Sequence, residues 1–233
     1  MRLRNFHRIL GLCLFIFLLN SAVTGLLRAN AKWWYWKDRP AKSEVMFLAA
    51  PAVGLEEIFK IYGNRFSQGR IHRVEFKLLL GKPVYLLETD DPQKKYVLID
   101  ANSGKIVSPI DLDLAIEIAR LFVGQNDKVV LSESLPSFKA RKTNEARPVF
   151  RILFDDPLKT EVFVDQETAQ PVMVLDRGRR FGMWIVKLHE LDFAGMSRLG
   201  LTLLGIAVSI LSLTGLALGL KTRKLIKKEK LYS

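Results

Sequence analysis

Residues 83–107 read PVYLLETDDPQKKYVLIDANSGKIV, and they align without a gap on residues 148–172, which read PVFRILFDDPLKTEVFVDQETAQPV. Eight of the 25 aligned positions are identical at this offset of 65 residues. The identities are Pro83 with Pro148, Val84 with Val149, Asp90 with Asp155, Asp91 with Asp156, Pro92 with Pro157, Val97 with Val162, Asp100 with Asp165 and Val107 with Val172. Chance agreement at this level is improbable, so the sequence predicts two copies of one structural unit.

Each copy is predicted to be a β-hairpin followed by a second turn. Alternating apolar residues at 84–88 and 149–154 indicate the first strands, Asp-Asp-Pro indicates a turn, and residues 96–99 and 162–164 form the return strands. Asp100 and Gly104 shape the following turn in the first copy, and Asp165 takes the place of Asp100 in the second. Because Ala169 stands where the first copy has Gly104, we expect a tighter or differently shaped turn there.

A helix is expected before each hairpin, over residues 55–62 and 112–123, with Gly63 and Gly124 as their C-terminal stops. These elements give an α+β domain of two tandem repeats, at residues 51–110 and 111–176. The single cysteine, Cys13, lies outside this domain, so the domain contains no disulfide and depends on its apolar core.

Two long apolar segments flank this domain. Residues 9–27 and 199–220 carry no charge, and as helices they would be about 28 and 33 Å long, against a hydrocarbon core of roughly 30 Å. Arg8 and Arg28 bracket the first segment, and Arg198 and Lys221 bracket the second. Both are therefore predicted to span a membrane. The alternative for the first segment is a signal peptide cleaved near Ala31, after a basic start and a small-x-small site.

The distribution of charge predicts the orientation. Residues 1–8 hold three Lys or Arg and no acid, and the tail at 221–233 holds six with a single Glu, so both termini are expected in the cytoplasm. Residues 28–50, which include the aromatic run Trp33-Trp34-Tyr35-Trp36, would form an interfacial segment on the outer side. Residues 177–198 would form an amphipathic interfacial helix, and the central domain would be periplasmic or extracellular.

The net charge of +12 does not indicate nucleic-acid binding. Much of the basic excess lies in the tail, where attraction to anionic lipid accounts for it.

The segments YVLIDANSGK and VFVDQETAQ resemble the PepSY domain. A first span that opens HRILG and closes TGLL, and a last span preceded by KLHELDFAGMSRLG and closing SLTGLALG, resemble PepSY-associated transmembrane helices of bacteria. The resemblance extends from His7 to about Leu220 and implies the bacterial inner membrane. Larger relatives of this kind include iron-regulated proteins and reductases that bind haem through membrane histidines, whereas soluble PepSY domains are thought to restrain secreted metallopeptidases. This sequence has only two predicted spans, whereas the larger relatives have four or more, and this difference argues against a reductase.

Three histidines are the candidate cofactor ligands. By the resemblance, His7 and His189 correspond to the histidines that open the first span and precede the last. They are predicted at opposite faces of the membrane, so haem b would require an oligomer, and the main expectation is no cofactor. Otherwise His7 lies among lipid head groups and His189 on an interfacial helix at 181–193. His72, between Arg70 and Arg73 in a predicted strand or its entry, is expected to be solvated.

No GxSxG, HExxH, P-loop or CxxC motif is present, and the Asp-Asp pairs are expected to be structural, so neither catalysis nor a metal site is predicted.

The expected partners are the lipid bilayer and another membrane or periplasmic protein, with a homodimer as a further alternative. One function is an accessory subunit of an envelope system for iron, another metal or electron transfer. Its helices would dock through small residues, namely Gly11, Ser21, Gly25, Gly205, Ser209, Ser212 and Gly215. The alternative is a membrane-anchored regulator of an extracytoplasmic peptidase that offers a strand edge.

Overall fold

A computed structural model describes residues 3–31, 51–66, 69–91, 94–124, 126–139, 145–190 and 197–229. Most of the predicted interfacial segment at 28–50, with its aromatic run, lies outside these ranges, as does the end of the basic tail. The chain divides into two compact units, one formed by residues 1–36 with 178–233 and the other by residues 37–177.

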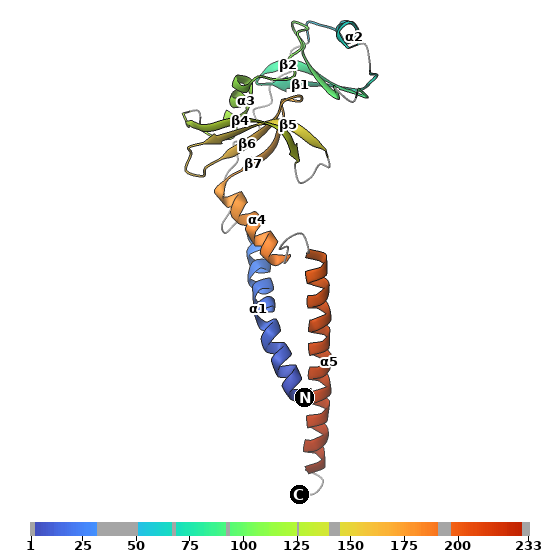
Figure 1. Ribbon diagram of the computed structural model, residues 1–233, viewed down its shortest axis with the longest axis vertical. Helices are drawn as coiled ribbons and strands as arrows, with labels where there is room; N and C mark the ends of the chain where they lie inside the picture. Colours follow the sequence, from blue (N-terminus) through green and yellow to red (C-terminus); the bar gives the residue numbers. More distant parts are fainter. Residues whose placement is uncertain are drawn as a thin grey trace. The chain divides into compact units, whose positions relative to one another are not determined.

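The first unit is helical. Helix α1 covers Leu3–Ala29, α4 covers Arg177–His189 and α5 covers Ser197–Glu229, and α1 and α5 pack side by side (Figure 1). Residues 3–29 and 199–222 are long and apolar enough to span a membrane, each with a mean hydropathy of 2.2. Large apolar side chains such as Leu12 and Leu213 are 74% and 68% exposed. This exposure is what lipid contact requires, since a core helix of a soluble protein would bury such residues.

The second unit opens with a three-stranded antiparallel sheet. Its strands are β1 at Ile71–Leu79, β2 at Lys82–Thr89 and β3 at Tyr96–Asp100, in that order across the sheet. Helix α2, at Leu55–Arg65, buries Ile58 and Tyr62 against one face. That face presents alternate residues of β2 and β3, namely Tyr85, Leu87, Val97 and Ile99. The helix and this sheet therefore form one apolar core.

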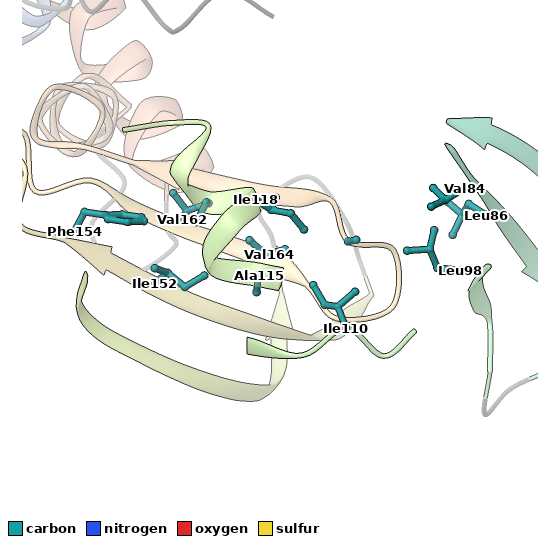
Figure 2. Close-up of a cluster of buried hydrophobic side chains, with 12 residues drawn as sticks. Val84, Leu86, Leu98, Ile110, Ala115, Ile118, Ile152, Phe154, Val162 and Val164 are labelled. Atoms are coloured by element: carbon teal, nitrogen blue, oxygen red, sulfur yellow. The ribbon is translucent and has the colours of Figure 1, made fainter. Parts of the chain in front are cut away.

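A four-stranded antiparallel sheet follows, in the order β4, β5, β6 and β7. These strands cover Val129–Lys139, Ala146–Phe154, Glu161–Asp165 and Pro171–Leu175. Helix α3, at Leu112–Arg120, begins where the Asp111 carboxylate accepts a hydrogen bond from the Leu114 amide. It packs on the second sheet through Ala115, Ile118 and Ala119, as Figure 2 shows in part. Val84, Leu86 and Leu98, from the far face of the first sheet, belong to the same apolar cluster and join the two sheets.

The two hairpins match position by position. Val84 pairs with Asp100 in the first sheet, and Val149 pairs with Asp165 in the second. The four core residues that face α2 also have counterparts 65 positions later in the chain, and these face α3. The counterparts are Phe150, Ile152, Val162 and Val164. The expectation of a different turn at Ala169 is wrong, because Ala169 adopts a φ of 54° where Gly104 adopts 70°. The Gly104 and Ala169 amides also donate to the corresponding carbonyls, those of Asp100 and Asp165.

Some predicted boundaries differ from the structure. Helix α2 continues through Gly63 to Arg65, since a single glycine inside a helix weakens it without ending it. Helix α3 ends at Arg120, three residues before the predicted end, in a series of turns. Strands β1 and β4 precede the aligned hairpins. A strand or its entry was predicted around His72, where β1 begins, whereas β4 was not predicted. Helix α4 ends at His189 rather than at residue 193.

Candidate functional site

His189, a predicted cofactor ligand, packs against α1 in the helical unit. Its Nδ1 lies 3.1 Å from the Thr24 hydroxyl oxygen. Thr24 is only 4% exposed. A Cβ at Gly25 would come within 3.3 Å of the His189 Cε1, so the absence of a side chain at Gly25 makes room for the ring. His189 thus rests on a Thr-Gly pair of α1, and the interfacial position of its helix stays a prediction.

His7 makes the same contact with the other span. Its Nδ1 lies 2.8 Å from the Thr214 hydroxyl oxygen, and a Cβ at Gly215 would lie 3.1 Å from its Cε1. His7 therefore contacts the other span, and its depth among lipid head groups stays a prediction. We call each group of one histidine and one Thr-Gly pair a His/Thr-Gly contact. One consists of His189, Thr24 and Gly25, and the other of His7, Thr214 and Gly215.

The hydrogen bonds at each threonine favour one histidine tautomer. The Thr24 hydroxyl lies 2.6 Å from the Asn20 carbonyl oxygen, and the Thr214 hydroxyl lies 2.9 Å from the Ile210 carbonyl oxygen. A hydroxyl has one proton, and when it is donated to the carbonyl the threonine oxygen accepts from a histidine that carries its proton on Nδ1. The Nε2 atom of a neutral ring then has a free lone pair, the arrangement that second-shell bonds impose on ligating histidines.

Two further bonds support the contact at His189. The Asn20 side-chain amide donates to the Leu188 carbonyl at 2.8 Å, which holds the last turn of α4 against α1. Arg28 and Glu190 form an exposed ion pair at 3.4 Å. An exposed pair of this kind contributes only about 0 to 1 kcal/mol, so Asn20 and the His/Thr-Gly contact are the main determinants of the geometry.

The two histidines do not fit a haem held by one chain. Thr24 follows His7 by 17 residues on α1, and this separation corresponds to about 25 Å of helix. His7 therefore lies near one end of α1, and His189 of α4 contacts the other end. The described residues supply one candidate ligand at each of these two depths. A haem with two histidine ligands needs both at one depth, so the second would have to come from another subunit.

Asp100, Gly104 and Asp165, predicted as turn residues, occupy matching turns in the second unit. Asp100 Oδ1 accepts hydrogen bonds from the Asn102 and Ser103 amides at 2.9 and 2.7 Å, and Asp165 Oδ1 accepts from the Glu167 and Thr168 amides at 2.9 and 2.8 Å. Burial opposes ionisation of Asp100, but the bonds from Ser103 and Asn102 outweigh it and lower the pKa of the carboxyl. Both aspartates therefore organise turns.

Asp165 has an additional contact. It is fully buried, and its Oδ2 lies 3.6 Å from an Arg147 guanidinium nitrogen. The Arg147 guanidinium also stacks over Tyr96 at 4.6 Å and donates to the Tyr96 hydroxyl at 2.9 Å. Tyr96 belongs to the first sheet and Arg147 to the second, so this group braces the junction of the two sheets. The sequence offered no pattern that predicts it.

The remaining candidates are structural. His72 is 59% exposed and its Nε2 lies 3.7 Å from an Asp90 carboxylate oxygen, so its expected solvation is accompanied by a weak ion pair when it is protonated. Asp90 accepts a bond from the Arg70 amide, and Asp156 from the Thr160 hydroxyl at 2.8 Å. Among the residues that the structure describes, no three His, Cys, Asp or Glu side chains gather in a way that could hold a metal ion.

The spans, the folded domain between them and the matching turns agree with one known family. The model of the PepSY-associated TM region matches residues 1–222. The chain belongs to the PepSY-associated TM region family. A search among curated proteins finds no match. Family membership, with two candidate spans, identifies this chain as a membrane PepSY protein that resides in a lipid bilayer.

The His/Thr-Gly contacts add to the family resemblance a detail that the sequence only hinted at. The dipeptide Thr-Gly occurs once in each span, at residues 24–25 and 214–215. The histidine that contacts the first pair is His189, and the one that contacts the second pair is His7. Repetition of a small polar dipeptide inside apolar segments was the available signal. It could not be assigned to the histidines without knowing which helix faces which.

Proposed function

We propose that this PepSY protein is a non-catalytic accessory subunit that binds another protein in the bacterial inner membrane. Both termini would be cytoplasmic and the two-sheet domain periplasmic, in accordance with the basic ends of the chain. Its helices would dock to the spans of a partner, and its outer domain would contact the partner's periplasmic part. The system served would handle iron, another metal or membrane electrons.

The observation that carries this proposal is a row of small residues on α5 that points away from α1. Gly205, Ser209, Ser212 and Gly219 are exposed and follow one another at intervals of four, three and seven residues, which places them on one helix face. A Cβ at Gly205 or Gly219 would meet nothing within 4 Å, in contrast to Gly11, Gly25 and Gly215, which approach other side chains of this unit. The small residues are thus divided between internal packing and an outward face.

Small residues promote association because they let two helix backbones approach closely in lipid. Ser209 and Ser212 donate to the Gly205 and Val208 carbonyls of their own helix, both at 2.9 Å. These hydroxyls can exchange that bond for an acceptor on a neighbouring span, at about 0.6 to 2 kcal/mol each. The face therefore suits another helix better than it suits lipid chains.

A photoreactive benzoylphenylalanine placed at position 212 tests this proposal in native membranes. We expect a cross-linked product from position 212 and none from position 210, where Ile210 is exposed on the opposite side of the helix. A product at twice the chain mass of 26.6 kDa would identify a second copy, and any other mass a different subunit. Equal products from the two positions, or none from either, would overturn docking through this face.

If the chain takes part in electron transfer through haem, the ligand geometry restricts how the haem could be held. One histidine from this chain would supply one axial position, with its Nδ1–H bound to threonine, and a partner or a second copy would supply the other. Haem would contribute one-electron chemistry there. An absorbance spectrum of the purified complex, compared with that of the chain alone, tests whether association creates such a site.

The alternative function, restraint of an extracytoplasmic peptidase, is favoured by the edge strand β4. This strand lies at the border of its sheet, and Val130 and Leu131 are 60% and 38% exposed. Pro136 and the register shift after Leu135 block the far part of the edge, which leaves residues 129–135 for an added strand. Val130→Lys with Leu131→Lys should raise peptidase activity in the envelope, whereas Leu55→Lys, an exposed position on α2, should not. Unchanged activity would contradict this alternative.

A further inference from the structure

A polar cleft of about 160 Å³ lies at the junction of the two sheets, and the proposed function does not use it. Its first wall is one face of the first sheet, where Arg73 pairs with Glu88 and Glu75 pairs with Leu86 across neighbouring strands. Tyr96 continues this face on β3, since it pairs with Glu88. The opposite wall includes Arg147, at the start of β5.

The cleft is open because the contact between the sheets changes character along this face. Val84, Leu86 and Leu98 pack into the shared apolar cluster, and the Lys77 ammonium donates to the Thr168 carbonyl at 2.7 Å. Further along the same face the side chains become charged, and charged groups are not driven together in the way that apolar ones are. Leu86, only 7% exposed, forms the apolar floor at the boundary.

Charges of both signs line the cleft in equal number. Arg73 and Arg147 are cationic, and Glu75 and Glu88 are anionic. Arg73 lies 3.6 Å from Glu75, and both side chains remain partly exposed, at 68% and 42%. A pair this long and this accessible contributes little stability, so either group can turn to a ligand at small cost.

Arg147 is the best-positioned donor in the cleft. Its guanidinium is held by the stack on Tyr96, by the bond to the Tyr96 hydroxyl and by Glu145 at 3.2 Å. Burial lowers the pKa of Arg147, but Glu145, Tyr96 and Asp165 together raise it above its ordinary value. The Arg147 Nε is buried and has no hydrogen-bond partner among the described residues.

The chemistry of the walls selects the ligand. An anion would meet Glu75 and Glu88, and a cation would meet two guanidinium groups, so either would be repelled by half of the lining. A molecule that carries a carboxylate and an ammonium group satisfies both sets, and an apolar side chain suits Leu86. The volume is about five times the ~30 Å³ that one water occupies in the liquid, which admits a molecule of amino-acid size.

We propose that the cleft between the two sheets binds a small zwitterion of the α-amino acid type, either a free amino acid or the end of a short peptide. Arg147 and Arg73 bind its carboxylate, Glu88 and Glu75 bind its ammonium group, and Leu86 contacts its side chain. The membrane PepSY protein would then respond to a soluble molecule in addition to its membrane partner.

Equilibrium dialysis of the full chain in neutral phosphatidylcholine nanodiscs tests this proposal. The probes are labelled leucine and leucyl-leucine, with isovalerate and isoamylamine as analogues that lack the amine and the carboxylate. We expect saturable binding of a zwitterion at one site, and at least about tenfold weaker binding of both analogues, because each analogue leaves one pair of charged side chains without its partner. Preference for leucine or for the dipeptide identifies the free or the peptide form.

Variants locate the site. Arg73→Gln and Glu88→Gln should each weaken binding about tenfold or more, and Arg147→Lys should do so with unchanged circular dichroism, because lysine lacks the planar fork. Lys60→Gln is the matched control, since Lys60 forms an exposed ion pair with Glu56 on α2 and lines no part of the cleft. The proposal is overturned if no probe saturates at up to about 10 mM, if an analogue binds as tightly as the zwitterion, or if Arg73→Gln binds normally.

Discussion

His189 Nδ1 and the Thr24 hydroxyl oxygen lie 3.1 Å apart, although 165 residues separate them in the chain. His7 and Thr214 repeat this relationship at 2.8 Å over 207 residues. In both, the residue after the threonine is a glycine that lies under the ring. The helical unit is therefore joined at both ends of α1 by the same three residue types.

Gly215→Val should loosen the contact between α1 and α5. The added Cβ would lie 3.1 Å from His7 Cε1, and overpacking of this kind costs about 1 to 3 kcal/mol. Gly219→Val is the control, because a Cβ there meets nothing within 4 Å. Thermal unfolding in detergent should show a lower midpoint for Gly215→Val alone, and equal midpoints for the two variants would contradict the contact.

The neutral histidines should carry their proton on Nδ1. Nitrogen-15 NMR of the protein at a pH where the rings are neutral should show a protonated Nδ1 and an unprotonated Nε2 for His7 and His189. Thr214→Val removes the acceptor and should alter the signals of His7 while leaving those of His189 unchanged. Protonated Nε2 signals from either ring in the wild type would refute the assignment.

The purified chain should be colourless. His7 and His189 lie at opposite ends of α1, so a single chain offers no pair of axial histidines at one depth. His189→Ala should leave membrane insertion and the two-sheet domain intact, as measured by protease protection and circular dichroism. A Soret band that disappears in His189→Ala but persists in His72→Ala would show instead that the protein binds haem.

Two glycine replacements should change stability in opposite directions. Gly104→Ala should cost about 1 to 2 kcal/mol, because the residue has a φ of 70° and its Cβ would come within 2.7 Å of Ile61. Gly63→Ala should gain about 0.5 to 1 kcal/mol, because Gly63 lies inside α2 with open space around it. Chemical denaturation of the full chain measures both. A stabilising Gly104→Ala would show that the turn has a different shape.

Acid should weaken the first hairpin through Asp100. The pKa of Asp100 in the folded protein lies below the ordinary value of 3.8. The stability that its carboxylate contributes is therefore complete above that value and is lost as the pH falls through the folded pKa. Asp100→Asn should therefore lose less stability than the wild type between about pH 5 and pH 2.5. Asp113→Asn, at an exposed carboxylate of α3, should follow the wild type. Parallel curves for all three would contradict a role of Asp100.

The two hairpins and the membrane spans could be predicted because their signals are local. The spans show as long charge-free runs, and the hairpins as aligned alternation around Asp-Asp-Pro. Strand β1 also shows alternation, since Val74, Phe76 and Leu78 are separated by charged residues. It precedes the aligned repeat, so only a strand or its entry around His72 was predicted there. Strand β4 was not predicted because Pro136 argues against a strand. The structure accommodates this proline at a register shift of an edge strand.

The candidate sites depended on contacts that the sequence does not encode locally. Ala169 was expected to change the turn because alanine disfavours positive φ, yet the hydrogen bonds to Asp165 and burial in the core hold it there. His7 and His189 were identified as the histidines of interest, but their threonine partners required the packing of α1 on α4 and α5. The brace of Arg147 and Tyr96 required the placement of one sheet against the other.

The long separation between His7 and Thr214 determines the order in which the protein can be assembled. A ribosome adds about 5 to 20 residues each second, so the 207 residues between them take roughly 10 to 40 s to synthesise. Until α4 is made α1 has neither of its two histidine contacts, and it lacks the contact with Thr214 for the whole of that time, because α4 and α5 are the last helices of the described chain to be made. The newborn first helix must therefore be held in the membrane by lipid or by the insertion machinery until the end of the chain arrives.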